Sequence, residues 1–370
     1  MRPRRILHVI TDLSVGGAEI TLSRLLAANP PAADQSWVVS LLPHGPLAGD
    51  LRACGIPLLE LDVRRVGGAV AGMLRLARLI AETKPDIVQG WMYHGDLAAL
   101  VALVLSGRRG AARLAWNIRC STLDFSRYLR LLRLVVRACA ALSSLPDLVI
   151  ANSQAGMDAH RALGYRPRHA VIVPNGIDTD RFRPDPAVRA PVRCELGVPQ
   201  EAILLAHVAR VDPMKDHAGF LRAMAQCADL HALLMGAGTE CLQAPANIHR
   251  LGRRSDVPRL LAAADFVVSS SAFGEGFSNA LAEGMACGLP PIATNVGDAA
   301  VIVGDSGAMV PPGDHEALAK AIRAMVQETS DQRAARGARA RARIASRFSL
   351  QLAQQRFNEV YAALMEAPTK

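Results

Sequence analysis

The feature that most constrains what this chain can fold into is a regular alternation of short apolar runs with longer helical patterns. The alternation fills the first half of the chain and starts again near residue 203. It is typical of doubly wound parallel sheets, in which a helix covers the sheet after each strand. The expected strands span residues 5–10, 37–42, 57–61, 86–89, 113–117, 148–151, 170–173, 203–208, 231–235, 248–251, 266–269 and 291–294.

A chain of 370 residues is long enough for two domains. Between residues 174 and 199, five prolines interrupt both helix and strand, which places the interdomain linker in this stretch. The sequence therefore predicts an α/β protein with two Rossmann-like domains, residues 1–180 and residues 190–347, that face each other across a cleft. Ligands of such sheets bind beyond the carboxyl ends of the strands, so site residues are expected in the loops that follow strands.

Composition and charge narrow the class of protein. Hydrophobic residues make up 51% of the chain and charged residues 20%, which excludes a disordered chain. The formal net charge of +9 favours an anionic partner, such as phosphate, nucleic acid or a membrane surface. The seven cysteines form no C-x-x-C pair, which argues against disulfides and zinc and favours the cytoplasm. No apolar run approaches the roughly 18 residues of a membrane span.

Two loops that follow expected strands carry groups suited to an anion. The first contains Gly16 and Gly17, which let backbone N–H groups approach a ligand at the start of a helix. The second carries Arg210 and Lys215, which are suited to clamp a diphosphate and to stabilise charge on a leaving group. Taken alone, the first loop is equally well explained as a flexible turn and helix start, and the second is better explained as two surface cations.

The segment 269–290 is the most informative in the chain. Small polar residues end a strand, Gly276 permits close backbone approach, and a helix is expected to begin near Phe277. Glu275 precedes this helix, and Glu283 lies about two turns inside it. Two carboxylates at different depths of one pocket suit the hydroxyls of a sugar or a ribose. The preference of acids for helix N-termini explains Glu275 but not Glu283. The amides expected to face the ligand are those of Phe277, Ser278 and Asn279.

The stretch from Glu275 to Pro290 closely resembles the signature of the retaining glycosyltransferases of family 4, which have the two-domain GT-B fold. Four further motifs occur in the order of that family, so the resemblance covers most of the chain. They are Gly16-Gly17-Ala18-Glu19, Pro174-Asn175-Gly176-Ile177-Asp178, Arg210 with Lys215, and Val310-Pro311-Pro312-Gly313-Asp314. Gly284 and Asn295 depart from the family's usual alanine and aspartate.

The resemblance implies that the second domain binds a nucleotide-sugar donor. Arg210 and Lys215 would bind its diphosphate, and Glu275 would hold hydroxyls of the transferred sugar. Glu283 would hold the ribose, and Arg253 lies in the loop that places the base. The other implied donor contacts are Gly16 and Gly17 from the first domain, and Gly276, Phe277, Ser278 and Asn279 from the second.

The resemblance assigns the acceptor to the first domain, which a C-terminal helix at residues 349–370 would cross back to join. His94 follows the strand at 86–89, where relatives place a histidine beside the donor sugar, although a lone histidine is more often structural. Asn117 and Arg119 resemble a motif of polysaccharide-building members, which places them on the acceptor side. The expected catalytic residues are Arg210, Lys215, Glu275 and His94.

The function implied is transfer of a sugar to a glycan or lipid-linked acceptor, in the synthesis of cell-surface polysaccharide or lipopolysaccharide. The two glutamates are assigned to binding, so a covalent carboxylate route is not favoured. We expect a retaining front-face transfer, in which a diphosphate oxygen takes the acceptor proton. Arg210 and Lys215 would supply the positive charge, so no metal or other cofactor is expected.

Residues 126–142 form a basic stretch of helical pattern without an acidic residue. Arg127, Arg130, Arg133 and Arg137 share one stripe at about 100° per residue, beside a broad apolar surface. Such a helix suits an anionic bilayer, which would make the protein peripheral on the inner face of the cytoplasmic membrane. A core helix with a solvated arginine edge explains the pattern equally well.

Other functions stay open. Residues 231–241 suggest a dinucleotide-dependent oxidoreductase, but Cys241 replaces the third glycine of the fingerprint. A non-catalytic nucleotide-sugar binder would explain the charge, whereas RNA-binding modules are missing and no nucleic acid partner is expected. A GT-B nucleotide-sugar epimerase would convert the donor without an acceptor.

Overall fold

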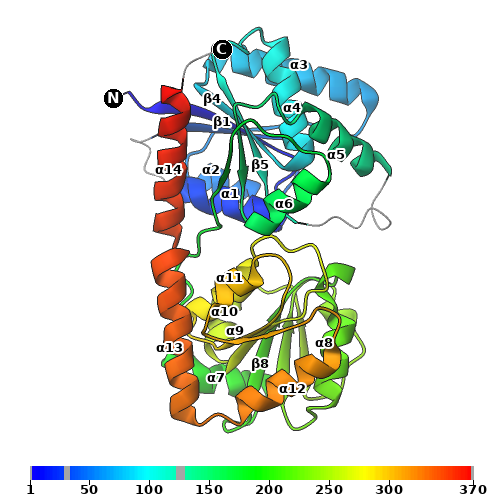
Figure 1. The fold of residues 1–370 in the computed structure, drawn as a ribbon, viewed down its shortest axis with the longest axis vertical. Coiled ribbons are helices and arrows are strands. Elements are labelled where there is room, and N and C mark those ends of the chain that lie inside the picture. The colour runs from blue at the N-terminus through cyan, green and yellow to red at the C-terminus, as the bar shows by residue number, and fades with distance from the viewer. Residues whose placement is uncertain (1, 29–33, 122–129, 368–370) are drawn as a thin grey trace. The chain divides into compact units, whose positions relative to one another are not determined.

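The computed structural model describes residues 2–28, 34–121 and 130–367. The chain forms two compact units: unit 1 consists of residues 1–176 and 350–370, and unit 2 of residues 177–349. Each unit contains one parallel β-sheet covered by helices (Figure 1). The expected α/β class with two Rossmann-like sheets is confirmed.

Among the described residues, the sheet of unit 1 has seven strands in the order β3-β2-β1-β4-β5-β6-β7. All its neighbouring strands are parallel, and the order reverses between β1 and β4, as in doubly wound folds. The strands are β1 Arg4–Ile10, β2 Asp34–Ser40, β3 Leu58–Glu60, β4 Ile87–Trp91, β5 Arg113–Ile118, β6 Leu148–Ala151 and β7 Ala170–Ile172.

Helices bury apolar side chains on both faces of this sheet. One cluster contains Leu76, Ala99 and Cys139, and the other contains Leu22 and Phe357. The first face is covered by α3, α4 and α5, and the second by α1, α2 and α14. The helices are α1 Gly17–Ala27, α2 Ala48–Ala53, α3 Val66–Thr83, α4 Met92–Leu105, α5 Arg130–Leu142, α6 Gln154–Ala162 and α14 Leu350–Glu366.

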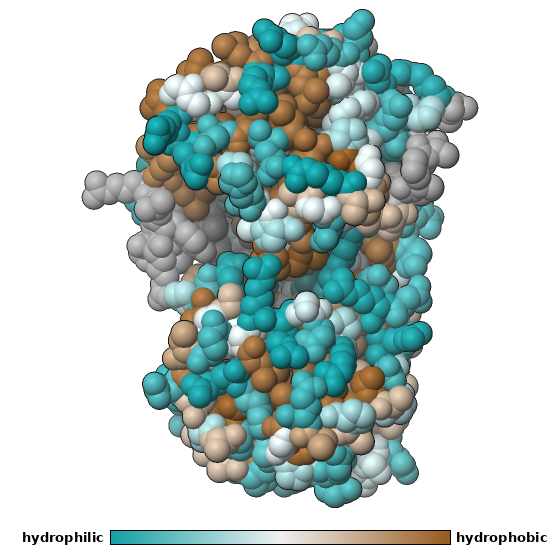
Figure 2. All heavy atoms as spheres, turned by 180° about the vertical axis from the view of Figure 1, so that it is seen from behind, coloured by the Kyte–Doolittle hydropathy of each residue, from teal (hydrophilic) through white to brown (hydrophobic). Residues whose placement is uncertain are grey.

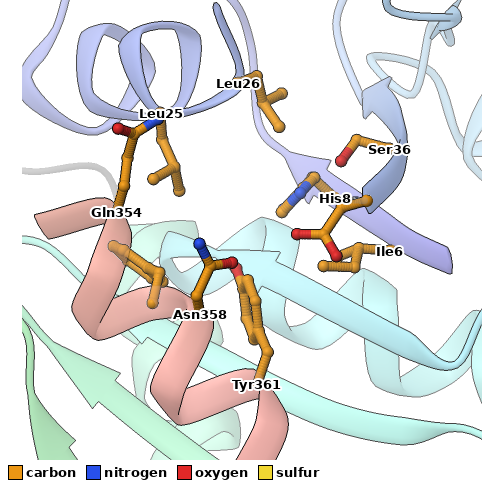
Figure 3. A pocket seen from close by; sticks show the side chains of 10 residues that line it. Ile6, His8, Leu25, Leu26, Ser36, Gln354, Asn358 and Tyr361 are labelled. Atoms are coloured by element: carbon orange, nitrogen blue, oxygen red, sulfur yellow. The ribbon is translucent and has the colours of Figure 1, made fainter. Parts of the chain in front are cut away.

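Helix α14, the last of the chain, packs on unit 1. Its side chains Phe357, Tyr361 and Leu364 are buried at intervals of four and three residues, the spacing of one apolar helix face. Figure 3 shows Asn358 and Tyr361 directed toward His8 of β1, where they line a small pocket. The C-terminal helix α14 therefore contributes to the hydrophobic core of unit 1, which is otherwise formed by the N-terminal part of the chain.

In the described part of unit 2, six parallel strands follow the order β10-β9-β8-β11-β12-β13. The strands are β8 Leu204–Val208, β9 His231–Met235, β10 Ile248–Gly252, β11 Phe266–Ser269, β12 Pro291–Thr294 and β13 Ala308–Val310. The helices are α7 Pro186–Leu196, α8 His217–Ala225, α9 Val257–Ala262, α10 Asn279–Ala286, α11 Ala299–Val303, α12 His315–Val326 and α13 Ser330–Arg347, with the 3-10 turns η1 Pro213–Lys215 and η2 Thr239–Cys241.

The structure differs from expectation in the stretch assigned to the linker, which contains helix α7. Asp185 caps this helix by accepting the N–H of Ala187, and Pro186 occupies the first turn, where a missing N–H costs nothing. Pro191 lies inside the helix. The boundary between the two units, at Gly176 and Ile177, lies within this stretch. The expectation that its prolines interrupt helix was wrong for residues 186–196, because Pro186 occupies the first turn and the helix continues through Pro191.

Two smaller differences concern the end of unit 2. Strand β13 was not predicted, because three residues are too few for a recognisable pattern. Helix α10 begins at Asn279, two residues later than expected, after Ser278 in extended conformation. Glu283 therefore lies about one turn inside the helix, and the expected two turns were wrong.

Candidate functional site

The carboxyl edge of the sheet in unit 2 brings two distant motifs together. Strand β8 ends at Val208 and leads through Arg210 to η1, which ends at Lys215. Strand β11 ends at Ser269 and leads through Glu275 to helix α10. Because β8 and β11 are neighbours in the sheet, the two loops emerge side by side.

Lys215 and Glu275 form an ion pair, in which the Lys215 Nζ donates to Glu275 Oε1. The same oxygen accepts the hydroxyl of Ser271 at 2.8 Å. The Lys215 side chain is 20% exposed and that of Glu275 is 10% exposed, so the pair is largely shielded from water. An anion that enters this site would compete with Glu275 for the ammonium group and would free the carboxylate for hydroxyl donors.

A small cavity lies at this pair. Its lining includes both members of the pair, and Ser271 and Ser278 add two hydroxyls. His207, on strand β8, also lines the cavity. The site therefore offers a cation, a carboxylate and hydroxyls within one unit of the fold.

Backbone contacts hold the loop that carries Glu275. The N–H of Ala272 donates to the Met214 carbonyl at 2.8 Å, and the N–H of Asp298 donates to the Gly276 carbonyl at 3.0 Å. Gly297 has a φ of 61°, and a Cβ there would lie 2.1 Å from the Glu275 carbonyl oxygen. Only glycine permits this approach, so residue 297 fixes the position of the loop.

Sequence reasoning missed the buried residues that hold the backbone of Lys215 in place. His207 Nε2 lies 2.9 Å from Ser270 Oγ, which donates to the carbonyl oxygen of Lys215 at 2.8 Å. Burial lowers the pKa of His207 well below its usual range, and the nearby charges of His217 and Lys215 lower it further. His207 is therefore neutral at pH 7. The sequence does carry a signal that could have identified His207, because it is a polar residue near the end of an otherwise apolar strand.

The other predicted donor residues lie at the same sheet edge with different exposure. Arg210 is 55% exposed and pairs with Asp212 at 3.3 Å. Arg253 follows β10 and is exposed, and Glu283 is buried on α10. The Phe277 side chain belongs to the core of unit 2, against Phe348, so only its backbone is available to a ligand.

In unit 1, the predicted residues lie at the starts of helices after two central strands. Gly16 is the N-cap of α1, and Gly17 is its first residue. His94 lies in the first turn of α4 and is half-buried, which lowers its pKa and keeps it neutral at pH 7. Met92 begins α4 with a φ of 63°, an unusual value for a residue other than glycine.

Asn117 and Arg119 lie at the carboxyl end of β5 in unit 1. Both are buried, Asn117 at 0% and Arg119 at 8% exposure. The Arg119 Nη1 donates to Asn175 Oδ1 at 2.7 Å, which ties β5 to the segment after β7. Asn117 thus lies within β5, and Arg119 directly follows the end of that strand.

Helix α5 covers residues 130–142 of the predicted basic helix, and residues 126–129 lie outside the described residues. Leu131 and Leu134 are 63% and 61% exposed, and Arg133 and Arg137 are exposed beside them. Figure 2 shows other apolar side chains exposed on unit 1. In the described ranges no helix is both long and apolar enough to cross a bilayer. The opposite face of α5 enters the core through Val136, Cys139 and Ala140.

Two family models match the chain. Glycosyltransferase Family 4 matches residues 15–181, and Glycosyl transferases group 1 matches residues 202–328. The chain is 33% identical to D-inositol 3-phosphate glycosyltransferase 2 of Catenulispora acidiphila, over 46% of each chain. It therefore spans about half the length of the curated relatives it matches.

Solved structures share the fold over nearly the whole chain. Anabaena HepE in complex with UDP-glucose has a TM-score of 0.85 at 23% identity, over 97% of this chain and 99% of that one. WaaG, a glycosyltransferase involved in lipopolysaccharide biosynthesis, has a TM-score of 0.66 at 18% identity, over 96% of this chain and 99% of that one. Both likenesses concern the fold.

Proposed function

Because this chain belongs to glycosyltransferase family 4 and has the GT-B fold, we propose that it transfers a sugar from a nucleotide-diphosphate sugar to an acceptor with retention of configuration. The observation that carries the proposal is the contact between Lys215 and Glu275 at the carboxyl edge of unit 2. Two motifs sixty residues apart supply a cation for a diphosphate and a carboxylate for sugar hydroxyls.

In the proposed reaction, the donor diphosphate draws the Lys215 ammonium away from Glu275. Arg210, which is exposed and pairs with Asp212 in its own loop, closes on the same diphosphate. The bond between sugar and phosphate then breaks, and the two cations stabilise the charge that develops on the departing diphosphate. The acceptor oxygen attacks from the same face, and a diphosphate oxygen takes its proton. This route uses protein cations and no metal.

Glu275 holds the sugar while this occurs. Once Lys215 has turned to the diphosphate, the Glu275 carboxylate accepts hydrogen bonds from sugar hydroxyls, and Ser271 keeps it oriented. The amides of Gly276, Phe277, Ser278 and Asn279 precede or begin α10, and Glu283 on that helix holds the ribose. Arg253 contacts the base.

Unit 1 supplies the acceptor side. The N-terminus of α1, at Gly16 and Gly17, offers backbone amides that suit a phosphate group. His94 is neutral at pH 7 because burial lowers its pKa, so it suits a hydrogen bond to the sugar without adding charge. Asn117 and Arg119 orient the acceptor.

For the substrates, we propose a UDP-sugar donor and a glycan or lipid-linked acceptor of a cell-surface polysaccharide. The UDP-glucose complex of HepE and the lipopolysaccharide role of WaaG support this choice. The D-inositol 3-phosphate glycosyltransferases named among the relatives make a phosphorylated inositol the second acceptor to test.

The test is a transfer assay with UDP-, GDP- and ADP-sugars and both acceptor classes. We expect nucleoside diphosphate and a glycosylated product whose anomeric signal keeps the configuration of the donor. Lys215→Ala and Arg210→Ala should each lower turnover about 100-fold, as for loss of one preorganised donor. Lys320→Ala, an exposed lysine on α12, is the matched control and should retain full turnover.

Other outcomes favour the alternative functions. Conversion of the donor sugar without an acceptor would identify an epimerase, and donor binding without turnover would identify a binding protein. Near-normal turnover in both cation variants would contradict the roles of Arg210 and Lys215.

We also propose that α5 rests on the inner face of the cytoplasmic membrane, as a peripheral contact. Exposed leucines beside exposed arginines support this, because such a face combines apolar insertion with attraction to anionic lipid. Wild type should float with phosphatidylglycerol vesicles at low salt, and Arg133→Glu/Arg137→Glu should not. Arg222→Glu/Arg339→Glu, which changes exposed arginines of unit 2 by the same charge, should still float. Absence of wild type from the vesicle fraction would refute the contact.

A further inference from the structure

Arg119 is a buried cation whose hydrogen-bonding capacity is only partly used. Nη1 donates to Asn175 Oδ1, but Nε and Nη2 are buried without a hydrogen-bond partner. Within the described ranges, its guanidinium belongs to no ion pair with a carboxylate. Burial lowers the pKa of Arg119 to about 9, so the group still carries its charge at neutral pH.

The unpartnered atoms lie on one edge of the guanidinium. Nε–H and Nη2–H point in parallel, and this edge binds a carboxylate or phosphate through two hydrogen bonds at once. The flat faces are occupied, because the Arg119 Cζ lies 4.9 Å from the centre of the Trp91 ring and 5.4 Å from that of Phe357. Aromatic contacts stabilise the charge through the faces, whereas the two donors of the edge are buried without a hydrogen-bond partner. The aromatic packing thus fixes the orientation of the guanidinium but provides no hydrogen-bond acceptor for Nε–H and Nη2–H.

Asn117 adds unpartnered groups close to Arg119 in sequence. Its Oδ1 and Nδ2 are buried without a hydrogen-bond partner. Asn117 lies in β5 and Arg119 directly follows the end of this strand, at the edge of the sheet where ligands of such folds bind. A buried polar group without a hydrogen-bond partner destabilises the folded protein, and here two nearby residues each carry such groups. A bound oxyanion would accept hydrogen bonds from the donors of both residues.

We infer that Asn117 and Arg119 form an oxyanion subsite in unit 1 that receives a phosphate or carboxylate group of the acceptor. The assignment to the acceptor rests on the proposed function, in which Arg210 and Lys215 of unit 2 take the donor diphosphate. The substrate class that follows is an acceptor with an anionic group near the hydroxyl that is glycosylated. A neutral glycan would leave the buried charge without a partner.

Inorganic phosphate is the probe for the first experiment, which measures its effect on thermal unfolding at constant ionic strength. The full chain carries Arg210→Ala/Lys215→Ala, so that the two cations of the proposed donor site do not bind the probe. We expect millimolar phosphate to raise the melting temperature, since a ligand that binds only the folded state stabilises it. Adding Arg119→Gln should weaken phosphate binding about tenfold or more, the effect of losing one charge-assisted hydrogen bond.

Two further variants keep the test decisive. Arg161→Gln, an exposed arginine of unit 1, is the matched control and should leave the response unchanged. Arg119→Lys keeps the charge but not the parallel donors, and it should also weaken phosphate binding. It replaces Arg119→Gln in the comparison if the neutral variant does not fold. No response in the parent protein, or an equal response in the Arg119 variants, would overturn the subsite.

A second measurement separates the acceptor from the donor. Arg119→Gln in the otherwise wild-type chain should bind UDP with unchanged affinity. A parallel loss of UDP affinity would assign the oxyanion to the donor and overturn the acceptor role. If the wild type does not bind UDP or any other nucleotide, the proposed function fails, while the phosphate response still reports on the subsite by itself.

Discussion

Gly284 illustrates how a contact with the neighbouring strand determines which residue a helix position accepts. It lies inside α10, where glycine costs about 1 kcal/mol relative to alanine. A Cβ at this position would lie 2.5 Å from Val267 Cβ, on the strand beneath the helix. The larger valine of β11 therefore takes the space that an alanine would need.

We predict that Gly284→Ala destabilises the protein, because overpacking of a tight core costs about 1–3 kcal/mol and exceeds the gain in helix propensity. The free energy of unfolding in urea measures the effect. In a Val267→Ala background the space is available, so the same substitution should become neutral or stabilising. An additive pair of substitutions would contradict the steric explanation.

Asp96 gives a pH-dependent prediction from a single buried carboxyl. Burial raises its pKa well above the usual range, although the N–H of Asn117, bound to Oδ1 at 3.1 Å, opposes the rise. Above about pH 4 the unfolded chain loses this proton and the folded chain keeps it. The stabilising contribution of the group is therefore complete below that pH and falls as pH rises toward the folded-state pKa.

Asp96→Asn removes this titration and keeps an oxygen for the Asn117 N–H. Relative to wild type, the variant should gain stability as the pH is raised, by up to about 1.4 kcal/mol per pH unit. Urea unfolding at a series of pH values from about 4 to about 8 measures the difference. A difference that stays constant over that range would show that Asp96 does not retain its proton in the folded state.

At the scale of elements, α13 explains much of the excess of arginine. Its arginines donate to the carbonyl oxygens that end other helices of unit 2. Arg343 binds the carbonyls of Val301 and Ile302 in α11, and Arg341 binds that of Ala286, the last residue of α10. Cations at helix C-termini satisfy carbonyls that lack an intrahelical partner and complement the helix dipole.

Arg341 should therefore be a stabilising residue of the proposed donor unit. It also donates to the carbonyls of Phe182 at 3.1 Å and Thr179 at 3.2 Å. Arg341→Ala should cost about 2–3 kcal/mol, because several partly buried carbonyls lose a charged donor. Arg339→Ala, an exposed position two residues away on the same helix, should change stability by less than about 0.5 kcal/mol. Equal effects of the two substitutions would show that the carbonyl contacts contribute little.

The elements and their contacts differ in how far the sequence predicts them. Strands β6, β9, β11 and β12 were predicted at both ends, because apolar runs bounded by polar residues are local signals. Lys215 and Glu275 were predicted singly for the same reason. Their ion pair was not, because it depends on β8 and β11 being neighbours although β9 and β10 intervene in the chain. The contacts of Arg341 were not predicted either. A helix whose arginines face solvent has the same sequence pattern as one whose arginines bind carbonyl groups.

At the scale of the whole molecule, the chain enters unit 2 once and returns. The N–H of Ile177, which begins unit 2, donates to the carbonyl of Phe348 near its end, at 2.8 Å. Ile177 also forms a β-bridge with Ser349. The next residue, Leu350, begins α14 and belongs to unit 1 again. Helices α13 and α14 are thus consecutive in sequence but stabilise different cores.

Two phenylalanines nine residues apart should therefore act on different units. Phe348 packs against Phe277 in the core of unit 2, with ring centres 5.3 Å apart. Phe357 packs against Trp91 in the core of unit 1, with ring centres 6.4 Å apart. Each substitution to alanine should cost about 3–5 kcal/mol, the usual range for a buried phenylalanine.

Hydrogen exchange followed by mass spectrometry locates these losses. Phe357→Ala should speed exchange in β1, β4 and β5, which lie more than 200 residues earlier in the chain, and leave β8 and β11 protected. Phe348→Ala should have the opposite pattern. The contrast follows because the stability of a region depends on the core that it shares and not on its place in the sequence. Exchange that rises equally in both sheets for either variant would mean that the two units unfold as one cooperative body.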